Sequence, residues 1–331
     1  MINYAVIGTS MITGKFIESA QATNKWDLTT IYSRTAEKAE NFIDSEALKD
    51  ITIETDWNAF LNSTHFSTVY IASPNSIHFQ QAIALLKAKK NVVVEKPIFP
   101  TAAELKEAQR IANENNVFIF EAARHIHEAN FKIVKELVAN TPNIEGATFA
   151  YSKYSSRYDQ VLNGEQPNIF TTKFAGGALV DLGIYLVYSA VAWFGVPERS
   201  HYFAKKIVTG VDGSGTIILE YPDFNVTLLT GKIVQSYLGS EIYSNQSTIL
   251  LDAVNAITTI DVWDRKTDTT TAKGVEAPEL LLYDEAIAFA SVINNPTDAK
   301  ALEDYREWSE LTLNVTTLVE SLRKDAGIVY D

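Results

Sequence analysis

The chain has 331 residues, 46% of them hydrophobic, and a formal net charge of −13 at pH 7. This length suits two domains, and the acidic balance without a basic block argues against nucleic acid or an anionic membrane as a partner, because both would require clustered Lys and Arg. The absence of cysteine excludes disulfides, thiolate catalysis and cysteine-metal sites.

The remaining composition favours small molecules as ligands. No basic stretch followed by an apolar segment opens the chain, and no run reaches the roughly 20 apolar residues of a membrane span. Only five histidines are present, so no metal site is expected. We therefore expect a cytoplasmic protein without nucleic acid, membrane or metal partners.

The first 120 residues alternate between strand and helix patterns. Such βαβ alternation predicts a parallel sheet with helices on both faces, with ligands bound at the carboxyl ends of the strands. The strands are expected at 2–7, 28–32, 69–72, 91–94 and 117–120, and the helices at 12–23, 35–45, 76–89 and 101–115.

The pattern changes after about residue 122. A helix at 126–139 leads into longer runs rich in Tyr, Thr and Val, which predict an antiparallel or mixed sheet. These runs lie at 147–154, 202–208, 215–221, 225–234 and 247–251, and two helices at 276–293 and 302–325 close the chain. We expect an α/β protein with domains at 1–122 and 123–331, the second being α+β.

The turn after the first strand reads GTSMIT at 8–13. A dinucleotide-binding turn usually reads G-x-G-x-x-G, and only Gly8 is retained here. Gly8 can make the tight turn, and a helix beginning near Ile12 would offer N–H groups to a pyrophosphate. Ser10 replaces the second glycine with a small hydroxyl. A nucleotide-binding turn and an ordinary strand-to-helix turn both fit this segment.

The second strand ends in Tyr32-Ser33-Arg34. An acidic residue here would hold the ribose hydroxyls of NAD, whereas a hydroxyl followed by arginine suits the 2′-phosphate of NADP. The alternative is that Ser33 caps the next helix and Arg34 is a solvated side chain.

The loop after the strand at 69–72 reads Ser73-Pro74-Asn75-Ser76-Ile77-His78. Pro and Asn favour a turn, which would leave polar backbone where a cofactor ribose would lie. For His78 a structural role, or a place on a helix surface, is the alternative to cofactor contact.

A Glu95-Lys96 pair ends the apolar run at 92–94 and precedes Pro97. Such a pair is costly at the end of a buried strand unless it is paired or functional. Lys96 could hydrogen-bond a substrate oxygen and assist proton transfer. A surface lysine in a loop is the alternative.

The segment 177–194 predicts a helix that is apolar nearly all round and therefore buried. Asp181 and Tyr185 lie one turn apart on one face. A carboxylate and a phenol in this setting need partners, and the preceding Gly176-Gly177 allows backbone or ligand to approach closely. The alternative is an internal hydrogen bond between the two side chains.

Together these segments resemble the Gfo/Idh/MocA oxidoreductases. The resemblance spans nearly the whole chain, and EKP with GGALxDxGxY is its specific part. It rests on VIGTSMIT, YSR, VYIASPNSIH, VVVEKP, EAARH and GGALVDLGIY, in this order. It implies a Rossmann-type nucleotide-binding domain and a second domain whose large open, mainly antiparallel sheet commonly forms the interface of a homodimer or homotetramer.

The resemblance also assigns roles to residues. Lys96 is similar to the family's catalytic lysine, Asp181 matches a motif aspartate near the substrate, and Tyr185 stands where many members carry histidine. Ser33 and Arg34 resemble NADP-using members, so NADP is favoured over NAD. The candidate cofactor-binding residues are Gly8, Thr9, Ser10, Met11, Ile12, Ser33, Arg34, Ser73, Pro74, Asn75, His78, Glu95 and Lys96.

The chain departs from the family after Glu121, where Arg124, His125 and His127 stand instead of an aromatic residue and a later proline. This departure predicts a more polar substrate mouth. The candidate substrate contacts are Arg124, Lys153 and Arg157.

These assignments predict reversible hydride transfer between nicotinamide and a carbinol carbon of a sugar, polyol or related diol. Tyr185 would exchange the hydroxyl proton, Lys96 would stabilise a phenolate, and Asp181 would orient the substrate or Lys96. One alternative is a non-catalytic NAD(P)-binding sensor, although a pure binder needs neither Lys96 nor Tyr185. Another is an unrelated enzyme in which EKP is coincidental.

Overall fold

The computed structural model describes all 331 residues, and they form two compact units. The first unit comprises Met1–Arg124 and Pro278–Glu310, and the second comprises His125–Ala277 and Leu311–Asp331. The division therefore differs from the expected contiguous domains 1–122 and 123–331, because a late segment of the chain returns to the first unit.

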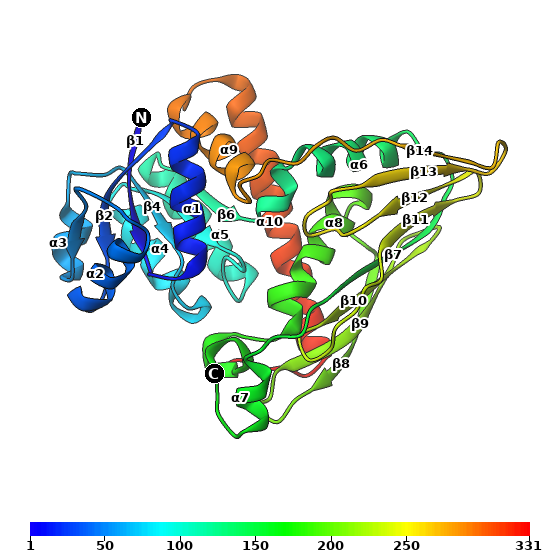
Figure 1. The fold of residues 1–331 in the computed structure, drawn as a ribbon, viewed down its shortest axis with the longest axis horizontal. Helices are drawn as coiled ribbons and strands as arrows, with labels where there is room; N and C mark the ends of the chain where they lie inside the picture. Colours follow the sequence, from blue (N-terminus) through cyan, green and yellow to red (C-terminus); the bar gives the residue numbers. More distant parts are fainter. The chain divides into compact units, whose positions relative to one another are not determined.

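The first unit contains a six-stranded sheet with the order β3-β2-β1-β4-β5-β6, and every neighbouring pair is parallel (Figure 1). This is the strand order of a Rossmann fold, so the predicted fold of this unit is confirmed. The strands are β1 Ile2–Ile7, β2 Trp26–Tyr32, β3 Thr52–Glu54, β4 Thr68–Ile71, β5 Asn91–Glu95 and β6 Ile119–Ala122.

Helices connect these strands. They are α1 Met11–Ala22, α2 Ala36–Ser45, α3 Trp57–Asn62, α4 His78–Lys87, which follows the 3₁₀ turn η1 Asn75–Ile77, and α5 Ala102–Asn115. The elements β3 and α3 were not predicted from the sequence. Both are short, and β3 has no buried residue, so neither gives a clear hydrophobic period.

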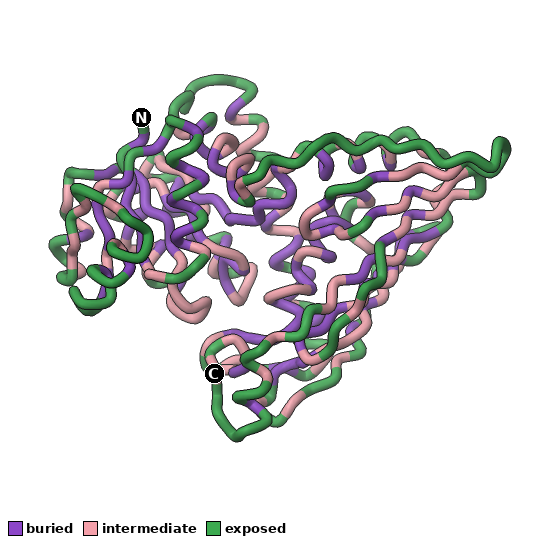
Figure 2. The backbone as a smooth tube through the Cα atoms, viewed as in Figure 1, coloured by how far each residue is buried: buried purple, intermediate pink, exposed green.

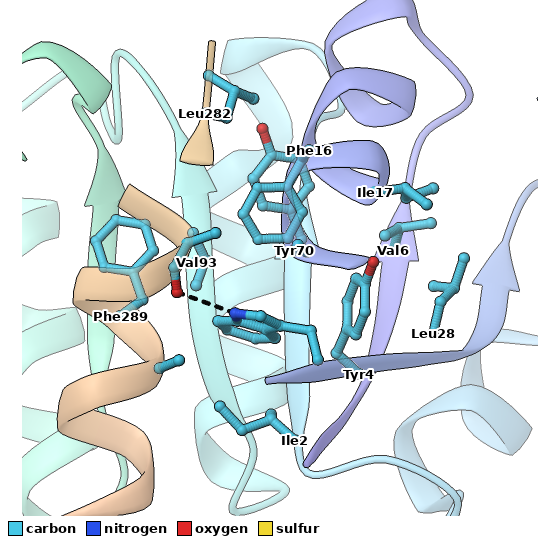
Figure 3. Packing of buried hydrophobic residues seen from close by; sticks show 14 of the residues in the cluster. Ile2, Tyr4, Val6, Phe16, Ile17, Leu28, Tyr70, Val93, Leu282 and Phe289 are labelled. Carbon is cyan, nitrogen blue, oxygen red and sulfur yellow. Dashed lines mark hydrogen bonds between the residues drawn. The ribbon is translucent and has the colours of Figure 1, made fainter. Parts of the chain in front are cut away.

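The core of the first unit explains why the late segment belongs to it. Trp26 Nε1 donates a hydrogen bond to the carbonyl oxygen of Ala286 at 2.9 Å. Leu282 and Phe289 pack in the same cluster as Phe16 and other residues of the parallel sheet and α1 (Figure 3). The helices concerned are α9 Tyr283–Asn294 and α10 Ala299–Asp325, the latter running from the first unit into the second.

The second unit contains an eight-stranded sheet with the order β14-β13-β12-β11-β7-β10-β9-β8. Only β7 and β10 pair in parallel, which confirms the predicted mainly antiparallel sheet. The strands are β7 Ile144–Ser152, β8 Arg199–Lys206, β9 Asp212–Glu220, β10 Asn225–Gly231, β11 Ser240–Ser244, β12 Ser247–Leu251, β13 Ile260–Asp264 and β14 Thr269–Ala272.

The two sheets differ in how they are covered. The inner strands of the parallel sheet are almost wholly buried, whereas the large sheet mixes buried with half-buried residues (Figure 2). This follows from helices on both faces of the first sheet and on one face of the second (Figure 1). The turn η2 Arg124–His127 begins at the last residue of the first unit's opening segment, and the further helical elements of the second unit are α6 Ala129–Ala139, α7 Tyr158–Leu162, η3 Asn168–Phe170, η4 Thr172–Phe174, η5 Leu179–Gly183 and α8 Ile184–Phe194.

The expected helix at 177–194 is not one regular helix. A π-helical turn, η5, precedes α8, and π-helical turns are frequent at functional sites. The segment Thr172–Phe194 is long and apolar enough to cross a membrane, but 78% of its most apolar window is buried. That burial is what a core helix of a folded unit shows.

Candidate active site

The turn after β1 requires glycine. Gly8 has φ +105°, and a Cβ there would lie 2.6 Å from the carbonyl oxygen of Ala72 in the loop after β4. Ser10 is the N-cap residue of α1, but its side chain caps no backbone N–H, and its Oγ instead lies 3.1 Å from Thr13 Oγ1. The first turn of α1 is therefore without a side-chain cap, which leaves its backbone N–H groups available to an anion.

The segment after β2 contributes two cations to a pocket. The N-cap of α2 is Thr35, which contradicts the alternative that Ser33 caps this helix. Ser33 Oγ accepts a long hydrogen bond from the Thr35 backbone N–H at 3.5 Å. Arg34 and Lys38 both line the adjoining pocket. Lys38 was not predicted from the sequence as a cofactor-binding residue. Its position four residues after Arg34 could have indicated it, because residues with this spacing lie on one face of a helix.

The loops after β1, β2 and β4 line one pocket of about 530 Å³, a size typical of small-molecule sites. Its position at the carboxyl edge of the parallel strands is the place expected for a ligand. The predicted residues that line it are Gly8, Thr9, Ser10, Ser33, Arg34, Ser73 and Pro74; the others in the lining are Ile7, Tyr32, Thr35, Lys38, Ala72, Ile77 and Gln81.

The remaining predicted cofactor residues lie outside this lining. Met11 is exposed, whereas Ile12 packs against the core of the first unit. Asn75 begins η1, and Glu95 ends β5 directly before Lys96.

Two buried side chains fix the loop after β5. His78 is fully buried, so its place on a helix surface is excluded. Its Nε2–H donates to the Ser73 carbonyl oxygen at 2.7 Å, and its Nδ1 lies 3.2 Å from the Pro97 carbonyl oxygen. Burial lowers the pKa of His78. His78 thus ties the pocket loop after β4 to the loop that carries Lys96. The same Lys96 loop is held by Glu121, whose Oε1 accepts a hydrogen bond from the Ile98 N–H at 2.9 Å.

The end of β5 carries a half-buried carboxylate, that of Glu95. The Tyr70 hydroxyl donates to Glu95 Oε1, and the Lys96 backbone N–H donates to Glu95 Oε2 at 3.2 Å. Burial raises the pKa of Glu95, while these bonds and the charges of Lys96 and Arg124 act against that rise. The Lys96-Pro97 peptide bond is cis. Glu95 is therefore anchored within the protein, and Lys96 follows it at the carboxyl edge of the sheet.

In the second unit, neighbouring atoms of the protein leave no room for a side chain at either glycine of the GGALVDLG segment. A Cβ on Gly176 would lie 2.6 Å from the Ile169 carbonyl oxygen. Gly177 has φ +129°, and a Cβ there would lie 2.1 Å from Asp212 Oδ1. The same buried carboxylate accepts a hydrogen bond from the Leu179 backbone N–H at 2.6 Å. The sequence predicted that backbone or a ligand would approach these glycines closely. In the structure the Ile169 backbone approaches Gly176 and the Asp212 carboxylate approaches Gly177.

Asp181 lies in η5 and pairs with Lys232, a residue that was not predicted from the sequence. Its Oδ2 is 2.6 Å from Lys232 Nζ. The Lys232 side chain is 2% exposed and that of Asp181 is 37% exposed. Lys232 could have been identified from the sequence as a charged residue within the apolar run at 225–234, which was expected to form one strand. The structure ends β10 at Gly231, directly before this lysine.

Tyr185 lies in the first turn of α8 and is half-buried. Its ring centroid is 4.8 Å from that of His125 and 5.8 Å from that of Tyr151. The second ring meets it edge to face, as aromatic pairs prefer. The orientation of the Tyr185 ring is therefore set by two neighbours of its own unit.

The candidate substrate contacts lie in different places. Arg124 is buried and contributes positive charge near Glu95 in the first unit. Lys153 is exposed, and its backbone N–H donates to the Gly231 carbonyl oxygen at 2.9 Å, beside Lys232. Arg157 is exposed at the start of α7. Lys153 therefore shares an end of the large sheet with the Asp181-Lys232 pair.

Titratable side chains form no metal centre. No group of three or more His, Cys, Asp or Glu side chains is arranged to hold an ion. Burial, with a contribution from Lys132, lowers the pKa of His127 to about 3, so this histidine is neutral at physiological pH.

Comparisons with known proteins identify the family of this chain. Residues 2–123 match the model of the Gfo/Idh/MocA oxidoreductases, described as an oxidoreductase family with an NAD-binding Rossmann fold. The oxidoreductase YgjR of Escherichia coli (strain K12) is 33% identical over 330 residues, covering 100% of this chain and 98% of the relative. The chain belongs to the Gfo/Idh/MocA oxidoreductase family.

Two further comparisons extend over the full length of this Gfo/Idh/MocA member. The scyllo-inositol 2-dehydrogenase (NADP(+)) IolU of Bacillus subtilis (strain 168) is 33% identical, covering 100% of this chain and 98% of the relative. The crystal structure of KijD10, a 3-ketoreductase from Actinomadura kijaniata in complex with NADP and TDP-benzene, has a TM-score of 0.84 at 19% identity and covers 100% of this chain and 99% of its own. At that identity the second likeness shows the fold.

The close approach at Gly177 predicts a specific loss of stability in this family member. Gly177→Ala should lower the free energy of unfolding by well over the roughly 1–2 kcal/mol that the positive φ alone would cost an alanine. The additional loss arises because the new Cβ displaces the Asp212 carboxylate. Gly164→Ala is the matched control, since Gly164 also has positive φ but no atom within 4 Å of a new Cβ. Urea unfolding of both variants makes the comparison, and equal losses would contradict the account.

Proposed function

We propose that the protein is an NADP-dependent oxidoreductase that transfers a hydride between nicotinamide and a carbinol carbon of a sugar, polyol or related diol. The observation that carries the proposal is the pocket lined by the Gly8 turn together with Arg34 and Lys38. The full-length relative whose name specifies a scyllo-inositol substrate and NADP supports both the substrate class and the cofactor.

The residues of the pocket fit this cofactor. The uncapped first turn of α1 and the Ser10 hydroxyl would bind the pyrophosphate. Arg34 and Lys38 would bind the 2′-phosphate, which carries the charge that NAD lacks. The backbone of Ser73 and Pro74 would lie along a ribose.

The bound nicotinamide would supply or accept the hydride. We propose that Tyr185 exchanges the proton of the reacting hydroxyl and that the Lys96 ammonium stabilises the phenolate form during the exchange. Asp181 would accept a hydrogen bond from a substrate hydroxyl, and Arg124, Lys153 and Arg157 would contact other polar groups of the substrate. The protein would thus provide orientation and charge while the cofactor provides the redox chemistry.

We also propose that the protein works in the cytoplasm as a homodimer or homotetramer. The face of the large sheet opposite the helices is the proposed interface. Phe203 of β8 is 68% exposed, and its neighbour Tyr202 is buried on the helix-covered face. The Phe203 side chain would lie in this proposed contact with a second copy.

Removing the pocket cations should change the preference between the two cofactors. Arg34→Ala and Lys38→Ala should each weaken NADPH binding about tenfold or more, because each removes a charge-assisted bond to the 2′-phosphate, and should leave NADH binding nearly unchanged. Fluorescence titration measures both affinities, with Lys25→Ala, an exposed lysine at the amino end of β2, as the control. Equal losses for NADPH and NADH would show that these cations do not read the 2′-phosphate.

The proposed proton transfer predicts a separation of binding from turnover. Lys96→Met and Tyr185→Phe should each lower kcat by about 10²-fold or more, with NADPH affinity nearly intact, in steady-state assays with polyols and sugars. Lys87→Met, an exposed lysine in the last turn of α4, should turn over normally. A Lys96→Met variant with unchanged kcat would remove the assignment of Lys96.

A further inference from the structure

Lys232 is a buried lysine at the end of β10. Its side chain is 2% exposed, and its ammonium lies 4.7 Å from the ring centroid of Phe170. Its backbone N–H donates to the Gly213 carbonyl oxygen at 2.7 Å, so the chain cannot swing outward here without breaking a bond. An ammonium in this place requires compensation by opposite charge.

Two carboxylates supply that compensation, and they differ in exposure. Asp181 Oδ2 contacts the ammonium directly at 2.6 Å, and its side chain is 37% exposed. Asp212 is 1% exposed; burial raises the pKa of its carboxyl group, and the charge of Lys232 acts against that rise. Asp212 also accepts a bond from the Tyr202 hydroxyl at 2.6 Å, which fixes it in the core. The ammonium therefore interacts with an anchored carboxylate and with one that reaches the surface.

The backbone that carries Asp181 is also held against β10. A Cβ on Gly183 would lie 3.3 Å from Thr230 Cγ2, so the glycine lets η5 pack closely against the strand that ends beside Lys232. The Asp181 carboxylate is thus fixed both by its backbone and by its ion pair. A buried ion pair is weak evidence for stability, since apolar replacements are often as stable, and a role in orienting a polar group is the better account of this one.

We propose that Lys232 is a positioning residue that acts through Asp181. The ammonium holds the Asp181 carboxylate in one orientation, so that it serves as a hydrogen-bond acceptor for a substrate hydroxyl. This inference rests on the proposed function. It assigns proton exchange to other groups and gives Asp181 the task of orienting the substrate.

A double-mutant cycle tests the proposal. Lys232→Met and Asp181→Asn should each lower kcat/KM about tenfold or more with NADPH affinity unchanged. The double variant should be no slower than the slower single variant, because the lysine affects the substrate only through the Asp181 carboxylate. Lys232→Arg, which keeps the charge, should recover part of the loss. Multiplying losses in the double variant would overturn the proposal.

Lys90→Met is the matched control for removing a buried lysine. Lys90 also lies over a phenylalanine ring, at 4.8 Å from that of Phe66, but its ammonium donates to the backbone carbonyl oxygens of Ser63 and Phe66. This variant should lower the unfolding temperature while kcat/KM stays unchanged. An equal loss of kcat/KM in Lys90→Met would trace the effect to general destabilisation and overturn the proposal.

The same variants separate this inference from the proposed function. A wild-type protein inactive on every polyol and sugar tested would overturn the proposed function. The unfolding temperatures of the four proteins of the cycle would then decide the inference: shifts that fall short of additivity support the coupling of Lys232 to Asp181, and additive shifts overturn it.

Discussion

The buried carboxylate of Asp212 is the contact on which the candidate site of the second unit depends. It fills the space that a side chain at position 177 would occupy, accepts the Leu179 N–H and interacts with the charge of Lys232. Those contacts determine where η5 begins and hence where Asp181 and Tyr185 lie. The glycines of the motif are therefore a consequence of packing within the unit, and the polar residues after them are placed by that packing.

A comparable constraint operates in the first unit. The loops after β1 and β4 approach so closely that the Ala72 carbonyl oxygen leaves no room for a side chain at Gly8. His78 links the loop after β4 to the loop that carries Lys96. Because parallel strands direct their carboxyl ends to one edge, the loops after β1, β2 and β4 line one pocket, and His78 ties the Lys96 loop to it. The missing glycines of the dinucleotide turn are tolerated because only the first is sterically required by this neighbour.

Those features of the structure that follow from hydrophobic periodicity within a segment and from turn residues could be predicted from the sequence. The Rossmann-type sheet, the mainly antiparallel sheet and the pocket position of Ser33, Arg34 and Ser73 follow from such signals. Contacts between distant segments could not be predicted. The packing of α9 beside Trp26 and the pairing of Lys232 with Asp181 join parts of the chain far apart in sequence. A hydrophobic period identifies a helix but not the unit that it covers.

The central claim is that this chain transfers a hydride between NADP and a carbinol carbon. The most direct measurement follows deuterium from polyols, scyllo-inositol among them, labelled at the carbinol carbons and incubated with the protein and NADP⁺. The account predicts that at least one polyol yields NADPH carrying deuterium at C4 of the nicotinamide. Binding of NADPH by a protein that transfers no deuterium from any polyol or sugar tested would contradict it and would favour a sensor.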